Sequence, residues 1–209
     1  MQHRAVIFDL GGVILGSPLH AIADFEVETG IPSGRINRIV VDTGPEGAWS
    51  RLERGELAMP EFYGAFEREC AEAGVTLSAR ALIEVVGAAA QPRPTMIRAV
   101  ARIRDGGLGT AALTNNWIGE DDGSSVLRPH FDVFIESSVV GLRKPDPRIY
   151  RHTCEAIGIA PAEAIFLDDI GRNLKAARAL GMTTIKVDDP DEALRALGEL
   201  IGIALLDDA

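Results

Sequence analysis

Four short runs of apolar residues, each followed at once by polar residues, constrain the fold more than any other feature of the chain. They lie at residues 5–8, 109–113, 164–167 and 183–187. Short apolar runs rich in β-branched residues are typical of buried strands. A strand that is apolar along its whole length is covered on both faces, as in a parallel sheet between two layers of helices.

The segments between these runs have helical periodicity. One example places Ile97, Val100 and Ile103 on a single face, and another opens at Pro190 and carries Leu194 and Leu197. Strands that alternate with helices predict an α/β fold with a doubly wound parallel sheet.

Residues 16–94 interrupt this alternation, because they contain helical patterns alone. The apolar stripe Phe62, Phe66 and Cys70 is one such pattern, and the segment ends in the stiff connector Gln91-Pro92-Arg93-Pro94. We therefore expect a core domain built from residues 1–15 and 95–209, with residues 16–94 inserted after the first strand as a helical domain.

Chemically active side chains collect where the predicted strands end. Asp9 follows the first strand, Thr114 and Asn115 the second, and Asp168 and Asp169 another. Open α/β sheets bind ligands at the carboxyl ends of their strands. Carboxylates that converge there repel one another and require a cation, and hard oxygen ligands suit Mg²⁺.

Lys144, in the segment Gly141-Leu142-Arg143-Lys144-Pro145-Asp146-Pro147, adds a compact positive charge. A threonine hydroxyl and loop N–H groups can hold phosphate oxygens, and an aspartate beside them can act as a nucleophile. The residues thus predict metal-assisted phosphoryl transfer.

The same residues form an ordered set of four motifs. They are Phe8-Asp9-Leu10-Gly11-Gly12-Val13, Leu113-Thr114-Asn115, Lys144-Pro145 and Phe166-Leu167-Asp168-Asp169. This set resembles the motifs of the haloacid dehalogenase (HAD) superfamily. Residues 135–150 and 166–182 further resemble the N-terminal phosphatase domains of soluble epoxide hydrolases and of acyl-CoA dehydrogenase-family fusion proteins.

This resemblance implies a Rossmann-like core with a helical C1-type cap. It also implies a Mg²⁺-dependent phosphatase that acts on a small organic phosphate through an aspartyl-phosphate. Asp9 would be the nucleophile and a metal ligand, together with the carbonyl of Gly11 and the carboxylate of Asp169. Asp168 would orient Lys144, and Lys144 would neutralise both Asp9 and the phosphate.

By the same resemblance, Thr114 and Asn115 would hold phosphate oxygens. Asn173 lies four residues after Asp169, where some family members have a second acid. An amide at this position is expected to orient its neighbours.

Gly11 departs from the family pattern, because phosphatases of the family usually have an aspartate two positions after the nucleophile. That aspartate protonates the leaving oxygen and then activates water. Its loss should slow poor leaving groups most, so we expect a preference for glycosyl, acyl or aryl phosphates. A cap residue such as His20 is a candidate replacement.

Two other functions compete with the phosphatase. One is a HAD-fold module that binds phosphate or a partner protein with weak turnover. The other is a metal-independent 2-haloacid dehalogenase, which also lacks the second aspartate but leaves the pair Asp168-Asp169 unexplained. The sequence sets neither the physiological substrate nor the oligomeric state.

Composition excludes several further classes. The chain has a net charge of −10, which disfavours nucleic-acid binding. It has no apolar stretch long enough for a membrane span, and its apolar start contains Asp9 without a cleavage pattern, so we expect no signal peptide. Two cysteines, Cys70 and Cys154, fit reduced thiols in the cytoplasm.

Overall fold

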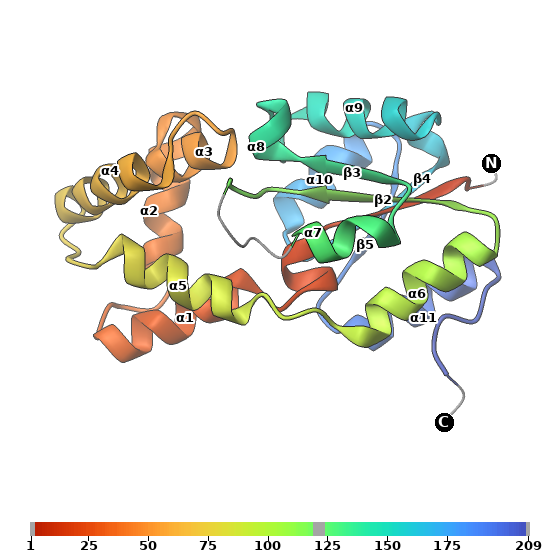
Figure 1. Cartoon of the computed structure of the whole chain (residues 1–209), viewed down its shortest axis with the longest axis horizontal. Helices are drawn as coiled ribbons and strands as arrows, with labels where there is room; N and C mark the ends of the chain where they lie inside the picture. The colour runs from red at the N-terminus through yellow and green to blue at the C-terminus, as the bar shows by residue number, and fades with distance from the viewer. Residues whose placement is uncertain (1–2, 119–123, 208–209) are drawn as a thin grey trace.

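The structure is a computed structural model that describes residues 3–118 and 124–207. Its core is a five-stranded sheet in the order β3-β2-β1-β4-β5, in which every neighbouring pair is parallel (Figure 1). The strands are β1 (Ala5–Phe8), β2 (Gly109–Thr114), β3 (Val133–Glu136), β4 (Ala164–Asp168) and β5 (Thr183–Lys186). The expected doubly wound α/β fold is confirmed.

Helices separate and follow the strands. They are α1 (Pro18–Thr29), α2 (Arg35–Thr43), α3 (Ala48–Glu53), α4 (Met59–Glu72), α5 (Ala79–Ala89), α6 (Pro94–Asp105), α7 (Ser124–Leu127), α8 (Ser137–Val140), α9 (Pro147–Ile157), α10 (Gly171–Ala179) and α11 (Pro190–Ile201). None of them, within the described ranges, is both long and apolar enough to span a bilayer.

The two faces of the sheet are covered by different helices, which explains the unbroken apolar strands. On one face Val6 and Phe8 of β1 pack with residues of α6 and α11, among them Val100 and Leu194. On the other face Ile7 packs with residues of α9 and α10. Every residue of β1 is fully buried, so both layers exclude water from the central strand.

The strand register brings the predicted site residues to one edge of the sheet. Phe8 of β1 lies opposite Ala112 of β2 and Leu167 of β4. The next residue, Asp9, continues the ladder by donating its N–H to the carbonyl of Leu167 at 2.9 Å. Asp9 therefore leaves the sheet level with the end of β4, beside Asp168.

Helices α1–α5, which we call the cap helices, pack around a hydrophobic cluster of their own (Figure 1). Trp49 lies at its centre, with its ring 5.7 Å from Phe62, 5.4 Å from Phe66 and 6.1 Å from Trp117 in edge-on geometry. Trp117 follows β2 and belongs to the sheet and its flanking helices α6–α11, which we call the sheet domain, so a residue from outside the cap helices completes this aromatic group. Such aromatic pairs favour edge-to-face contacts.

The chain enters and leaves the cap helices at one place. Leu15 forms an isolated antiparallel bridge with Pro92, and Gly16 donates its N–H to the carbonyl of Gln91 at 3.0 Å. The guanidinium of Arg93 donates to the carbonyls of Gly12 and Val13 at 2.7 and 2.8 Å. The two connecting segments are thus tied to each other and to the turn after β1.

One strand was not predicted from the sequence. β3 lies at an edge of the sheet, and Val133 and Phe134 are only half buried. Its apolar run, residues 133–135, is only three residues long and lies between Asp132 and Glu136, so it is shorter than the runs at residues 5–8 and 164–167. The four predicted strands are all present, each ending within one residue of its expected boundary.

Candidate active site

The turn after β1 positions Asp9. Its Oδ1 atom accepts a 2.7 Å hydrogen bond from the N–H of Leu10, which fixes the carboxylate against its own backbone. Gly12 follows with φ of 78°, a conformation that glycine adopts without strain. A Cβ atom at Gly12 would lie 2.1 Å from Oδ2 of Asp169, so the glycine also leaves room for that carboxylate.

Lys144 is buried at the centre of the site, with its side chain 1% exposed. Its Nζ atom lies 2.7 Å from Oδ1 of Asp9 and 2.9 Å from Oδ2 of Asp168. It also donates to the carbonyl of Leu113 at 2.9 Å. Three oxygens from three different strand ends therefore hold one ammonium group.

Asp168 is held from several sides. Oδ1 accepts a 2.7 Å hydrogen bond from the N–H of Ile170, and the amide of Asn173 donates to both carboxylate oxygens at 3.1 Å. Tyr150 in turn donates to the carbonyl of Asn173 at 3.0 Å. Asp168 is thus bonded to Lys144, the backbone and Asn173.

Burial shifts the pKa values of two carboxyl groups and the ammonium of the site. Burial, with the charges of Asp168 and Asp169 adding to it, raises the pKa of Asp9 well above its usual value despite the nearby Lys144. Burial and Asp168 likewise raise the pKa of Asp169. For Lys144, burial opposes the charged form, but Asp168 and Asp9 together outweigh it and raise the pKa of the ammonium.

The residues fit a divalent cation. Asp9, Asp168 and Asp169 each offer a carboxylate oxygen, and these oxygens lie within 4.8 Å of one another. Both oxygens of Asp168 are already bonded to Lys144 and Asn173, so Asp9 and Asp169 are the carboxylates available to a metal. Burial and the neighbouring carboxylates raise the pKa values of Asp9 and Asp169, and a bound cation would act against both effects.

The two predicted phosphate-binding residues are placed differently. Thr114 is buried at the end of β2 and lines a cavity beside the site. The side chain of Asn115 lines it too, but its amide is engaged: Oδ1 accepts from the N–H of Lys144 at 2.8 Å, and Nδ2 donates to the Lys144 carbonyl at 3.1 Å. Nδ2 also donates to Glu53 of α3 at 3.3 Å.

Gly11, the position of the missing acid, is crowded. A Cβ atom there would lie 3.0 Å from Cγ and 3.1 Å from Cδ of Pro18, the first residue of α1. His20, two residues further on, is exposed and does not line the cavity. The structure therefore places no histidine from α1 at the site in place of the acid.

The cavity lies between the sheet and the cap helices and measures about 1150 Å³. Gly11 after β1 and Thr114 and Asn115 at the end of β2 line it next to Asp9 and Lys144. The rest of the described lining is mainly apolar and includes Leu57, Met59, Tyr63, Ile83, Val86 and Trp117. Arg80 is the charged residue among the described lining, and its guanidinium lies 4.7 Å from the ring centre of Tyr63.

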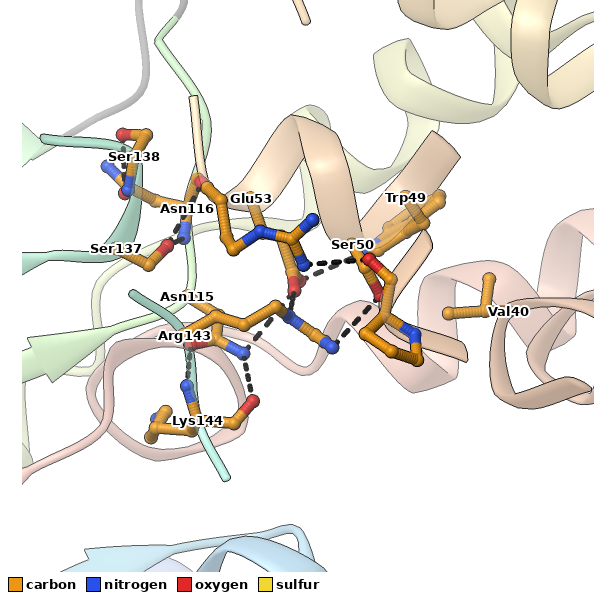
Figure 2. Close-up of polar contacts among 12 residues, drawn as sticks. Val40, Trp49, Ser50, Glu53, Asn115, Asn116, Ser137, Ser138, Arg143 and Lys144 are labelled. Carbon is orange, nitrogen blue, oxygen red and sulfur yellow. Dashed lines mark hydrogen bonds and ion pairs between the residues drawn. The ribbon is translucent and has the colours of Figure 1, made fainter. Parts of the chain in front are cut away.

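Sequence reasoning missed the polar contacts between α3 and the sheet domain (Figure 2). Glu53 accepts from Arg143 at 2.5 Å, and Arg143 also donates to the hydroxyl of Ser50 at 3.0 Å. These residues are about 90 positions apart, and no spacing pattern in the sequence connects them. The one available signal is that Arg143 immediately precedes Lys144.

Known proteins match this chain over nearly its full length. It is 41% identical over 210 residues to acyl-CoA dehydrogenase family member 10 of Mus musculus, covering 98% of this chain and 20% of that protein. It is 36% identical to bifunctional epoxide hydrolase 2 of Sus scrofa, covering 99% and 40%. The chain thus spans between a fifth and two fifths of the length of these two relatives.

A third relative is similar in length. Sesquiterpene phosphatase astK of Aspergillus oryzae is 26% identical, covering 95% of this chain and 97% of that protein. A HAD family enzyme of Bacteroides thetaiotaomicron, solved with magnesium and inorganic phosphate, shares the fold with a TM-score of 0.62 and 19% identity, covering 88% of this chain and 93% of that one.

The family described as haloacid dehalogenase-like hydrolase matches residues 3–181. This range contains all four strand-end motifs and the cap helices. The expected resemblance is confirmed by this match and by both groups of relatives. With its sheet order, strand-end carboxylates and buried lysine, the chain belongs to the haloacid dehalogenase-like hydrolases.

Proposed function

We propose that this chain is a Mg²⁺-dependent phosphatase that hydrolyses a small organic phosphate monoester through an aspartyl-phosphate on Asp9. The observation that carries the proposal is the buried ammonium of Lys144 between Asp9 and Asp168, beside the carboxylate of Asp169. This arrangement places one nucleophilic carboxylate, one fixed positive charge and one further acidic ligand next to Gly11 and Thr114, which line a cavity.

Asp9 is the nucleophile in this scheme. One oxygen of its carboxylate attacks phosphorus, the bond from phosphorus to the ester oxygen breaks, and the leaving oxygen takes a proton from solvent water and departs as the alcohol. Water then attacks phosphorus, which releases inorganic phosphate and regenerates the Asp9 carboxylate. Lys144 neutralises the charge shared by the nucleophile and the phosphoryl oxygens.

Asp9, Asp169 and the carbonyl of Gly11 are the proposed ligands of Mg²⁺. The chemistry that the ion supplies when bound is neutralisation of the phosphate and orientation of its oxygens. Asp168 is bonded on both oxygens, and its proposed role is to orient Lys144, with Asn173 holding Asp168 in place.

We assign the phosphate contacts after β2 to the hydroxyl of Thr114 and the backbone N–H of Asn115. The Asn115 side chain already bonds Lys144 and Glu53, so its proposed role is to fix the backbone around the lysine. Backbone N–H groups in such a loop form a suitable cradle for an anion.

The cavity supports an ester with an apolar organic part. Its described lining is dominated by aliphatic and aromatic side chains, and it opens directly onto Gly11 and Thr114. The name of the fungal relative, a sesquiterpene phosphatase, is consistent with an apolar phosphate ester. The leaving group should be a good one, because Gly11 supplies no acid to protonate it.

Hydrolysis of p-nitrophenyl phosphate tests the proposal, because its leaving group needs little protonation. Wild type should turn over with Mg²⁺ and lose this activity in EDTA, and Asp9→Asn should be inactive. The matched control is Asp188→Asn, which changes an exposed aspartate just after β5 that pairs with Lys186 at 2.6 Å. This control should keep wild-type activity.

The alternatives predict different results in the same assay. Turnover that survives EDTA would contradict the metal-dependent scheme, and halide release from 2-chloropropionate would identify a dehalogenase. Binding of inorganic phosphate without turnover of any ester would identify a binding module.

A further inference from the structure

We propose that Glu53 is a positioning residue for Lys144, through which the docked cap helices hold the catalytic lysine in place. The inference rests on the proposed function, because it takes Lys144 as the group that neutralises the phosphate. Glu53 does not line the cavity, so a direct contact with substrate is not its role in this structure.

One carboxylate oxygen of Glu53 has its hydrogen-bond partner within the cap helices. Oε1 accepts a 3.1 Å hydrogen bond from Nε1 of Trp49, one turn earlier in α3. Trp49 packs edge-on against Phe62 and Phe66, so its indole N–H has a fixed direction. The carboxylate is therefore oriented by the hydrophobic centre of the cap helices, and its side chain is 10% exposed.

The other oxygen of Glu53 faces the sheet domain (Figure 2). Oε2 accepts from Nε of Arg143 at 2.5 Å and from Nδ2 of Asn115 at 3.3 Å. Arg143 also donates to Oγ of Ser50 at 3.0 Å, and Ser50 donates to the carbonyl of Gly44 at 2.7 Å. One guanidinium from the sheet domain thus bonds two side chains of α3.

Both partners of Oε2 act on the backbone of Lys144. Arg143 is its covalent neighbour, and Asn115 pairs with its N–H and its carbonyl at 2.8 and 3.1 Å. The lysine side chain then runs from this fixed backbone to Asp9. Displacement of Glu53 removes a charged partner from Arg143 and a hydrogen bond from Asn115, and so loosens the backbone from which Nζ is aimed.

The backbone just after α3 packs closely against α8, which follows β3. A Cβ atom at Gly55, which has φ of 71°, would lie 2.3 Å from the carbonyl oxygen of Ser138. The only residue that fits this contact without movement is glycine. The Glu53 contacts therefore form in a cap position that the backbone itself defines.

A simple anchoring role would give a different kinetic result from a positioning role. If Glu53 only fixed the cap helices against the sheet domain, its loss would raise KM for apolar esters that fill the cavity. Acetyl phosphate is too small to need that part of the cavity, so its kcat would not change. If Glu53 positions Lys144, kcat for acetyl phosphate falls as well, because the lysine acts on the phosphoryl group itself.

The test variant is Glu53→Gln, which keeps the shape but cannot accept from donors on both sides. The matched control is Asp42→Asn, which removes an exposed carboxylate of α2 paired with Arg38 at 2.9 Å. We expect kcat for acetyl phosphate to fall about 10–100-fold in Glu53→Gln, the usual effect of losing a partner that orients an active group. The control should equal wild type.

Hydrogen exchange gives a readout that does not depend on activity. The N–H of Lys144 is bonded to Asn115, so the segment 141–146 should exchange slowly in wild type. Its exchange should accelerate in Glu53→Gln and stay unchanged in Asp42→Asn. If wild type hydrolyses no phosphate ester, the proposed function fails, yet this measurement still decides whether Glu53 holds the Lys144 segment.

Arg143→Lys is the second variant, for the case in which Glu53→Gln does not fold. It keeps the positive charge but cannot bond Glu53 and Ser50 with one planar group, so we expect a smaller change in the same direction. Unchanged kcat for acetyl phosphate together with unchanged exchange of 141–146, in a folded Glu53→Gln or otherwise in Arg143→Lys, would overturn the proposal.

Discussion

The ammonium of Lys144 lies 2.7 Å from the carboxylate of Asp9, and both side chains are almost entirely shielded from water. Asp168 approaches the same ammonium from the other side at 2.9 Å. Two buried carboxylates thus depend on one cation for charge compensation. The positive charge of Lys144 offsets the desolvation cost of burying these two carboxylates.

Replacing Lys144 by methionine should therefore destabilise the fold as well as abolish activity. Loss of one partner from a buried ion pair costs about 3–5 kcal/mol, because the remaining charge is uncompensated. Chemical denaturation at neutral pH measures the loss. Lys186→Met, which removes an exposed partner of Asp188, should change the free energy of unfolding by less than about 0.5 kcal/mol.

The destabilisation by Lys144→Met should shrink as the pH falls. Without the ammonium, the folded-state pKa of Asp9 rises further above its unfolded value, so the folded variant takes up a proton that the unfolded chain does not. Stability gained in this way is present at low pH and is lost as the pH rises through the folded-state pKa. A destabilisation that is the same at about pH 8 and about pH 5 would contradict this linkage.

Mg²⁺ affinity should increase with pH. Burial raises the pKa values of Asp9 and Asp169, and both groups must be ionised to bind a metal. Binding should therefore release protons, in an amount that decreases as the pH rises above these pKa values. Calorimetric titration in buffers with different ionisation enthalpies measures the release. Binding without proton release at any pH would show that the carboxylates are already ionised.

Gly11→Asp alone should restore little activity toward poor leaving groups. A Cβ atom at this position would lie 3.0 Å from the ring of Pro18, so the new side chain fits only if Pro18 moves by a few tenths of an ångström. The double variant Gly11→Asp with Pro18→Ala removes that obstacle. We expect it to hydrolyse alkyl phosphates about 10²-fold faster than wild type, the lower end of what general acid catalysis supplies.

The measurement is kcat/KM for phosphate esters whose leaving groups differ in pKa, with Pro18→Ala as the control. Wild type and the control should show a steep dependence on leaving-group pKa, and the double variant a shallower one. If Gly11→Asp raised kcat/KM equally with and without Pro18→Ala, Pro18 would not limit the action of an acid at this position.

The two cysteines should resist alkylation in the folded protein. Burial raises the pKa of Cys70 to about 12 and that of Cys154 to about 11, so neither forms appreciable thiolate near neutral pH. Iodoacetamide at about pH 8 should label both only after denaturation. Rapid labelling of the native chain at one cysteine would reveal local opening of α4 or α9, the helices that carry them.

Much of the sheet was predictable because its central strands are buried along their whole length. Residues 5–8 and 164–167 are uniformly apolar, because both faces of these strands are buried and a polar side chain on either face would lack a partner. β3 escaped prediction because its apolar run, residues 133–135, is only three residues long and is bounded by Asp132 and Glu136.

The strand-end residues Asp9, Asp168 and Asp169 were predictable for a related reason. The carboxyl ends of parallel strands lie at the same edge of the sheet, so residues that directly follow different strands in the sequence lie close together in the fold. The contacts of Glu53 were not predictable, because they join the inserted helices to a loop across about 90 residues. The same contacts explain why the side chain of Asn115 faces Lys144 and Glu53, where the motif alone suggested a phosphate.

The pairing of Leu15 with Pro92 has a consequence for how such proteins diversify. The intervening segment departs and returns through neighbouring positions, so its length places no demand on the geometry of the sheet. A duplication, deletion or replacement inside it leaves Asp9 on one side and α6 on the other where they were. The helices of this segment can therefore change in number and length while Asp9 stays in register with the sheet, as long as contacts such as that of Glu53 with Arg143 are kept.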